Sequence, residues 1–124
     1  MADVVPYNSN LFETLFQKLE EGFALCDRDH VILKINPGFT ALFGHTPEEA
    51  VGKRLDLLIA TTPEMMASSD AQAERIKTWE TVLSEAVFRT RKDGSLIKVS
   101  IVGNVYHLAD GEVLYCWNYL GLQG

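Results

Sequence analysis

Two Asp-Gly pairs, at 93–94 and 110–111, punctuate the last third of the chain, and each is flanked by strand-like apolar runs. Asp-Gly between such runs is a strong β-hairpin signal, because both residues tolerate the positive φ that tight hairpin turns require. Strands joined by hairpins are antiparallel, so this pattern argues against a parallel βαβ fold. We expect three strands here, over 85–91, 96–105 and 112–120.

Short helices are expected in the middle of the chain. Three sites pair a polar capping residue with proline at the first helical position, namely Asn36-Pro37, Thr46-Pro47 and Thr62-Pro63. The second also has Glu at its third helical position, which completes a capping box. A longer helix is expected over 70–83, with Ser69 and Gln72 as its own capping box.

The first third contains one helix and one hairpin. An amphipathic helix is expected over 10–21, with its apolar residues on a single stripe. Two short apolar runs, 23–26 and 31–35, follow and are joined by a polar turn. The resulting order predicts an α+β domain in which the helices cover one face of an antiparallel sheet.

The composition of the chain excludes several classes of protein function. A chain of 124 residues with 47% hydrophobic residues forms one domain. Its net charge of −6 argues against nucleic-acid binding. No apolar run would span a membrane, no signal peptide is visible, and two distant cysteines form no disulfide framework. A reducing cytoplasmic location is therefore expected.

No pattern of catalytic or metal-binding residues is visible. The sequence lacks a nucleophile elbow, a phosphate loop and an H-E-x-x-H motif, so we expect no enzyme. His30, His45 and His107 are assigned to surface turns and have no ligand-type neighbours at metal spacing. No metal site is predicted.

Four segments together resemble the PAS domain, or sensory-box, family. They are 24–39, which resembles the opening strands and an Asn-x-x-Phe helix start, 42–53 (L-F-G-H-T-P-E-E-A-V-G-K), 91–95 (R-K-D-G-S) and 110–113 (D-G-E-V). The resemblance implies a five-stranded antiparallel sheet in the order 2-1-5-4-3. It also implies helices on one face that enclose a small-ligand cavity, and a sensory function.

The resemblance also allows us to ask whether the chain has the residues that bind flavin or haem in subgroups of this family. The light-oxygen-voltage subgroup requires a reactive cysteine where this chain reads L-D-L-L-I-A at 55–60, so a covalent flavin–cysteine adduct is not expected. The haem-binding subgroup requires a histidine on the long helix, and 70–83 contains none. Flavin held without a covalent bond stays open, and the cofactor is unknown.

Alternation along the strands predicts the cavity lining. Val99 and Ile101 should face the helices. Two registers compete on the last strand, and the resemblance places Cys116, Asn118 and Leu120 inward, with Ala24 and Cys26 on the first strand. The candidate ligand-binding residues are Asn118, Cys116, Cys26, Val99, Ile101, Phe39, Phe43, Arg89 and Trp79.

Four of these candidates have alternative roles. A buried Asn118 could bind a ligand, or its partner could be backbone or water, which is favoured. An inward Arg89 would suit a carboxylate or phosphate, but an outward, solvated Arg89 is favoured. Cys26 and Cys116 could form a redox pair on neighbouring strands, although small buried hydrophobes are the favoured interpretation.

The same register leaves three aromatic residues of the last strand on the outer face of the sheet, where such a patch would mark an interface. We expect the helix over 10–21 to pack across this face, in its own subunit or in a second one, and a dimer is favoured. The interface residues would be Leu11, Phe12, Leu15, Phe16, Leu19, Tyr115, Trp117 and Tyr119.

These interpretations combine into one hypothesis. Residues 1–21 form a capping or dimerisation helix and 22–124 the PAS core. The chain is either a part of a larger receptor, which is favoured, or a free-standing protein. The domain binds a small ligand and signals through a homodimer to an output domain, without catalysis, nucleic acid or membrane. The alternatives are a ligand-free PAS protein–protein interaction domain and a non-covalent flavin redox sensor.

Overall fold

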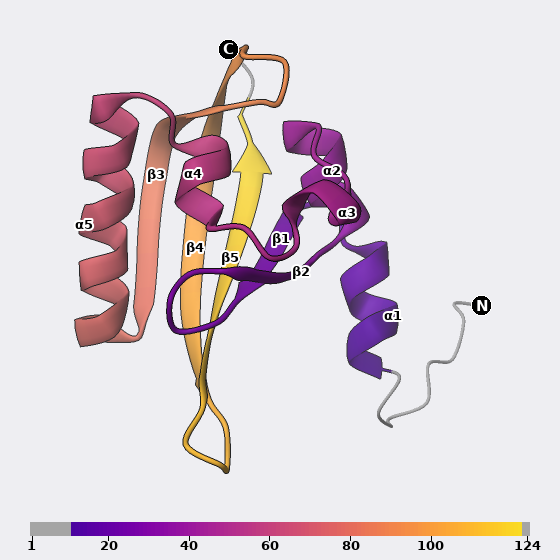
Figure 1. The fold of residues 1–124 in the computed structure, drawn as a ribbon, viewed down its shortest axis with the longest axis vertical. Coiled ribbons are helices and arrows are strands. Elements are labelled where there is room, and N and C mark those ends of the chain that lie inside the picture. Colours follow the sequence, from indigo (N-terminus) through magenta and orange to yellow (C-terminus); the bar gives the residue numbers. More distant parts are fainter. Residues whose placement is uncertain (1–10, 123–124) are drawn as a thin grey trace.

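One antiparallel sheet organises residues 11–122, the part of the chain that the computed structural model describes (Figure 1). Its strands lie in the order β2-β1-β5-β4-β3, which is the order that the PAS resemblance implies. The predicted α+β fold class is confirmed. The strands are β1 (Gly22–Cys26), β2 (Ile32–Ile35), β3 (Thr81–Thr90), β4 (Leu96–His107) and β5 (Val113–Gly121). The helices are α1 (Leu11–Lys18), α2 (Pro37–Phe43), α3 (Pro47–Ala50), α4 (Leu55–Ile59) and α5 (Pro63–Trp79).

The local turn and cap signals correspond to observed turns and caps. Gly94 and Gly111 both have φ of 90°, and the preceding aspartates accept backbone hydrogen bonds across their turns. Thr46 and Glu49 form the reciprocal capping box of α3. These signals depend on residues a few positions apart, so the sequence alone was enough to predict them.

The long helix differs from its prediction in both bounds. It begins at Pro63 rather than at 70, because the Thr62 hydroxyl caps it by accepting from the Met65 amide at 3.2 Å. It ends at Trp79, after which Glu80 takes φ of 62° and the chain enters β3. The predicted box at 69–72 lies inside a helix that is already formed, and α4 was not predicted.

The two faces of the sheet are assigned by the strand register, since directly paired residues share a face. We call inner the face toward α4 and α5. Trp117 on β5 pairs with Ala24 on β1 and with Gly103 on β4, both inner positions. The predicted orientation of β5 is therefore wrong. Tyr115, Trp117 and Tyr119 face inward and are buried, whereas Cys116, Asn118 and Leu120 face outward.

Side-chain volume explains this orientation. A Cβ atom added to Gly103 would lie 2.5 Å from Cζ3 of Trp117, so the glycine leaves room for the indole ring. Ala24, on the other side of Trp117, is the next smallest residue and is fully buried. Two small neighbours thus create the space for one large aromatic side chain in the core.

Helix α1 packs on its own chain at the β1–β2 end of the outer face. The Phe16 ring meets Phe23 edge-on at 5.1 Å, and the Lys34 ammonium lies 5.2 Å from the Phe16 ring centre. Lys34 also pairs with Glu13 of α1. Leu15 and Leu19 are exposed, and the side chains of Leu11 and Phe12 lie outside the described structure. The helix therefore covers part of the outer face only.

Candidate functional site

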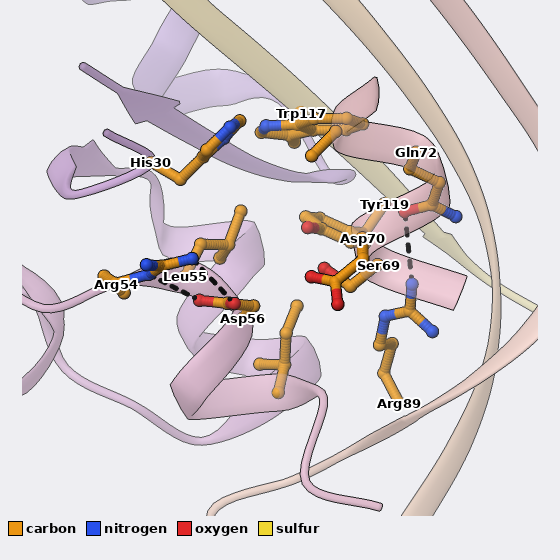
Figure 2. A pocket seen from close by; sticks show the side chains of 12 residues that line it. His30, Arg54, Leu55, Asp56, Ser69, Asp70, Gln72, Arg89, Trp117 and Tyr119 are labelled. Carbon is orange, nitrogen blue, oxygen red and sulfur yellow. Dashed lines mark hydrogen bonds and ion pairs between the residues drawn. The ribbon is translucent and has the colours of Figure 1, made fainter. Parts of the chain in front are cut away.

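A small cavity lies between the inner face of the sheet and helices α4 and α5 (Figure 2). It has about 30 Å³ of free space, enough for one or two water molecules, since roughly 10–15 Å³ is enough for one. Its walls combine charged and polar groups with apolar surface, and it lies beside the apolar core. The lining residues are His30, Arg54, Leu55, Asp56, Ile59, Ser69, Asp70, Gln72, Ala73, Arg89, Trp117 and Tyr119.

Arg89 of β3 is the most deeply buried charged residue of this wall, with only 2% of its surface exposed. Its Nη1 donates to the carbonyl of Phe88 at 2.9 Å. Its Nη2 donates to Gln72 Oε1 at 3.1 Å and to the Ser68 hydroxyl at 3.4 Å. All three acceptors are neutral, and burial lowers the pKa of the guanidinium from its ordinary value. The outward orientation that the sequence favoured is wrong.

A β-bulge turns Arg89 inward. The pairing of β3 with β4 shifts between Ser84 and Val87, so that Ser84, Val87 and Arg89 all pair with inner residues of β4. Strict alternation from Ser84 would place Ala86 and Phe88 inward instead. One extra residue in a strand reverses the orientation of every side chain after it.

Two buried nitrogens at the other end of the cavity lack a hydrogen-bond partner. They are Nε1 of Trp117 and Nε2 of His30. In Figure 2 the indole nitrogen faces the His30 ring. Trp117 is 4% exposed, and a buried N–H without a partner costs about 1–3 kcal/mol. The cavity is therefore a place where a polar molecule would complete unmet hydrogen bonds.

The turn between β1 and β2 carries His30, which lines this cavity. Asp27 Oδ1 accepts from the amides of Asp29, at 2.8 Å, and Val31, at 3.0 Å. His30 has φ of 64°, an uncommon conformation for a residue other than glycine, and its ring stacks on Tyr115 at 4.8 Å. The interactions of this turn keep His30 in place as part of the wall.

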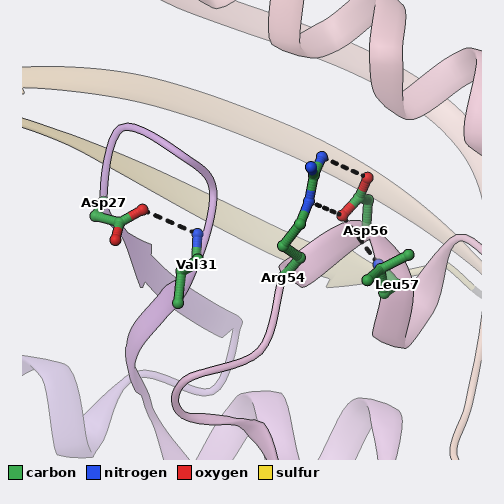
Figure 3. Close-up of polar contacts among 5 residues, drawn as sticks. All are labelled: Asp27, Val31, Arg54, Asp56 and Leu57. Carbon is green, nitrogen blue, oxygen red and sulfur yellow. Dashed lines mark hydrogen bonds and ion pairs between the residues drawn. The ribbon is translucent and has the colours of Figure 1, made fainter.

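Arg54 and Asp56 form the exposed side of the cavity at the start of α4. Arg54 donates to both carboxylate oxygens of Asp56, at 3.2 and 3.1 Å, and Asp56 also accepts from the Leu57 amide (Figure 3). The two charges thus neutralise each other. The Leu55 amide donates to the carbonyl of His30 at 3.0 Å, which joins this segment to the β1–β2 turn.

We expect the free energy of unfolding to fall as pH decreases from about 7.5 to 5.5. Burial lowers the pKa of His30 and of His45 from the ordinary value of 6.5, so the unfolded chain takes up these protons first. The stabilisation is complete above the unfolded pKa and is lost as pH falls toward the folded one. Glu49, whose pKa is lowered to about 2 chiefly by the Lys92 side chain, loses its contribution only at lower pH.

Urea unfolding at the two pH values measures this slope. His30→Asn combined with His45→Asn should flatten it, and asparagine tolerates the left-handed backbone of residue 30. Equal slopes in the double variant and the wild type would contradict the assignment.

The structure places the predicted ligand-binding residues in three groups. Arg89 lines the cavity. The ligand-binding roles of all nine predicted residues stay predictions. Cys26, Val99, Ile101, Phe39 and Phe43 are buried on the inner side, as predicted, but belong to the apolar core rather than to the cavity wall. Cys116, Asn118 and Trp79 lie away from the cavity.

Asn118 and Trp79 were misplaced for different reasons. Asn118 lies on the outer face, where its Nδ2 donates to a carboxylate oxygen of Glu21 at 2.9 Å, rather than to backbone. Trp79 is 72% exposed because α5 ends at that residue. Neither side chain lines the cavity.

The two cysteines do not form a pair. Cys26 faces inward and Cys116 outward, because Cys116 pairs with Leu25 rather than with Cys26. Both are free and buried, and burial raises the pKa of each thiol, that of Cys116 to about 12. Both therefore stay protonated at neutral pH, which suits the interpretation as small hydrophobic residues.

The histidines do not all lie in surface turns. His45 is buried, His30 is half-buried in its turn, and His107 is the exposed last residue of β4. Among residues 11–122, no group of three metal-binding side chains comes together. In the same part of the chain, no helix combines the length and apolar character needed to cross a membrane.

Several residues of the cavity wall were missed at the sequence level. The sequence predicts His30 in a surface turn, Trp117 and Tyr119 on the outer face, and Gln72 in a helix cap. A signal for Trp117 does exist, because two positions that pair with it, Ala24 and Gly103, carry the smallest side chains. Nothing comparable marks the bulge in β3.

The comparisons with known proteins support the same fold. Residues 20–118 match the family model for the PAS domain. No curated protein matches the chain. A PAS domain from Colwellia psychrerythraea is 12% identical, with 90% of this chain and 93% of that chain covered and a TM-score of 0.80.

Two further solved structures are similar. One is the PAS domain, in complex with ethanol, of a LuxR-family transcriptional regulator from Burkholderia thailandensis. It is 16% identical, with coverage of 97% and 100% and a TM-score of 0.75. The other is an RNA-binding light-oxygen-voltage receptor, 18% identical, with coverage of 98% of this chain but 35% of that one and a TM-score of 0.76. With the family match over most of its length, the chain belongs to the PAS domain family.

Proposed function

We propose that this domain is a sensory module that binds a small polar ligand in the cavity between the sheet and helices α4 and α5. The observation that carries the proposal is the pair of unpartnered nitrogens, Trp117 Nε1 and His30 Nε2, on two residues that line the cavity. Core atoms of this kind normally have a partner, and a ligand would supply it. The likeness to a PAS domain in complex with ethanol agrees with a ligand of this size.

The cavity does not fit a flavin. Pockets for ligands of that class measure roughly 300–1,000 Å³, at least about tenfold more than the 30 Å³ of free space here. The inward ring of Trp117 occupies part of the volume between the sheet and the helices. Residues 55–60 also lack the cysteine that a covalent flavin adduct requires.

The second part of the proposal is a homodimer that relays the signal to an output domain. Five exposed apolar residues lie on the outer face of β3, β4 and β5, which α1 leaves uncovered. We call them the outer patch: Leu83, Phe88, Val102, Tyr106 and Leu120. Residues 1–21 would serve as a capping or dimerisation segment beside it, and 22–124 as the PAS core. Exposed apolar patches are typical of interaction surfaces.

A ligand-free interaction domain is the alternative. The outer patch supports it, and so does a cavity that is large enough for only one or two waters. The two functions differ in whether a molecule other than water leaves the protein on unfolding.

Mass spectrometry under native and denaturing conditions tests ligand binding. We expect the native mass to exceed the denatured mass by a small adduct, or to gain one with added ligand. Filling the cavity with Ala73→Leu should abolish the adduct, whereas Ala67→Leu, at an exposed position of the same helix, should retain it. No adduct in any protein would favour the ligand-free alternative.

Light scattering after size exclusion tests the dimer. Val102→Glu introduces a charge into the outer patch and should convert a two-chain particle to a single chain. Leu57→Glu is the matched control, because Leu57 is 63% exposed on α4, on the opposite side of the sheet. A wild-type protein that stays monomeric at high concentration would refute the dimer.

A further inference from the structure

The charge of Arg89 indicates which chemical class of ligand the cavity would take. The guanidinium is nearly fully buried, yet it donates only to a carbonyl, a hydroxyl and an amide oxygen. Among the described side chains, no carboxylate lies within ion-pair distance of it. A buried cation without a counter-ion is unfavourable, because three neutral contacts do not replace a full negative charge.

The other charges of the wall do not compensate Arg89. Asp56 is held by Arg54 through two hydrogen bonds, so its charge is already neutralised. Asp70 of α5 also lines the cavity, but it is exposed to water and forms no ion pair with Arg89. Arg89 is therefore the buried charge of this wall that has no counter-ion in contact with it.

The opposite end offers neutral polar groups. The indole N–H of Trp117 has no acceptor, and the His30 ring nitrogen beside it also lacks a partner. Figure 2 shows these two rings together at one end of the cavity and Arg89 at the other, with Tyr119 between them. A ligand that bridges both ends would have an anionic group and a second polar atom.

We infer that the cavity binds a short carboxylate, one oxygen of which pairs with Arg89 while its other polar atoms face Trp117 and His30. This inference rests on the proposed function, since it assigns a ligand class to the same cavity. Gln72 and Ser68 accept both hydrogens of Arg89 Nη2, so the carboxylate would accept a charge-assisted hydrogen bond from Nε or from the second hydrogen of Nη1, which leaves its other oxygen for the opposite end. One negative charge balances one unpaired cation, whereas a phosphate dianion would add an excess negative charge beside Asp56. The limited space restricts the ligand to a few heavy atoms.

The two tryptophans of the chain provide a test with an internal control. Each gives one indole N–H signal in a ¹H–¹⁵N spectrum, and Trp117 lines the cavity whereas Trp79 is 72% exposed. Trp79→Phe assigns the two signals. Acetate, acetamide, phosphate and chloride are titrated separately in the millimolar range, because a ligand of so few atoms binds weakly. Acetamide has the shape of acetate without the charge.

We expect acetate to move the Trp117 signal in a saturable way and to leave the Trp79 signal unchanged. Acetamide, phosphate and chloride should not do so at the same concentrations. Arg89→Gln should weaken acetate binding by more than about tenfold, and Arg89→Lys, which retains the charge but not the planar fork, by less. Arg75→Gln removes the same charge at an exposed position of α5 and should bind within about twofold of wild type.

Other outcomes overturn the inference. If acetate and acetamide move the Trp117 signal equally, or if folded Arg89→Gln binds acetate like the wild type, the cavity accepts ligands without regard to charge. The sensory proposal would then stand and the carboxylate assignment would fall. If none of the four compounds moves the signal, the assignment falls as well, and the adduct measurement decides the sensory proposal separately.

Discussion

Replacing Asn36 with alanine is expected to lower the free energy of unfolding by about 4 kcal/mol. The Asn36 side chain is fully buried and joins three segments. Its Oδ1 accepts from the Phe39 amide, which caps α2, at 2.9 Å, and from the Phe23 amide of β1 at 2.8 Å. Its Nδ2 donates to the carbonyl of Glu21 at 2.9 Å. Alanine leaves all three backbone groups without this partner.

Two further variants make the test specific. Asn36→Ser retains an oxygen that can cap α2 at the Phe39 amide but loses the hydrogen bonds that Nδ2 donates, so it should be more stable than the alanine variant and less stable than the wild type. Asn104→Ala is the matched control, because the Asn104 side chain has only one exposed contact, with Thr81, and should lose less than about 1 kcal/mol. Urea denaturation measures all three. A loss below about 1 kcal/mol in Asn36→Ala would show that the side chain does not hold these segments together.

Substituting Gly103 with alanine should cost about 3 kcal/mol, because the new methyl group would lie 2.5 Å from Cζ3 and 2.7 Å from Cε3 of Trp117. The indole ring is confined between this glycine and Ala24, so it has little space to withdraw. Overpacking of this kind strains the core rather than removing a contact. Thermal or urea unfolding gives the size of the effect.

A double-mutant cycle separates this clash from a general preference for glycine. In a Trp117→Leu background, Gly103→Ala should cost about 1 kcal/mol or less, because the ring that it meets is absent. Gly121→Ala, at the C-terminal end of β5, serves as a control, since its new methyl group would meet the flexible ends of Leu42, at 2.9 Å, and Ile97, at 3.7 Å, rather than an aromatic ring. Equal costs in the two backgrounds would mean that Trp117 does not face inward.

The cavity shows which features of the candidate site the sequence could predict and which it could not. The sequence predicts that Arg89 would suit an anion if it faced inward, and its orientation depends on a bulge between Ser84 and Val87. No residue type at these positions specifies the bulge. His30 was likewise visible as a turn residue. Only the approach of α4 to that turn makes it part of a wall.

The sequence by itself determined the order of the elements. Helix caps, proline helix starts and Asp-Gly turns act over a few residues, so Asn36, Thr46, Gly94 and Gly111 do locally what their chemistry predicts. The tertiary structure decided which face each strand presents. Side chains alternate between the two faces of a strand, so the sequence of β5 alone allows either set of alternate residues to face inward. Packing against Ala24 and Gly103 selects the orientation that buries Trp117. The contents of the core, and with them the chemistry of the cavity, therefore depend on contacts between residues distant in the chain.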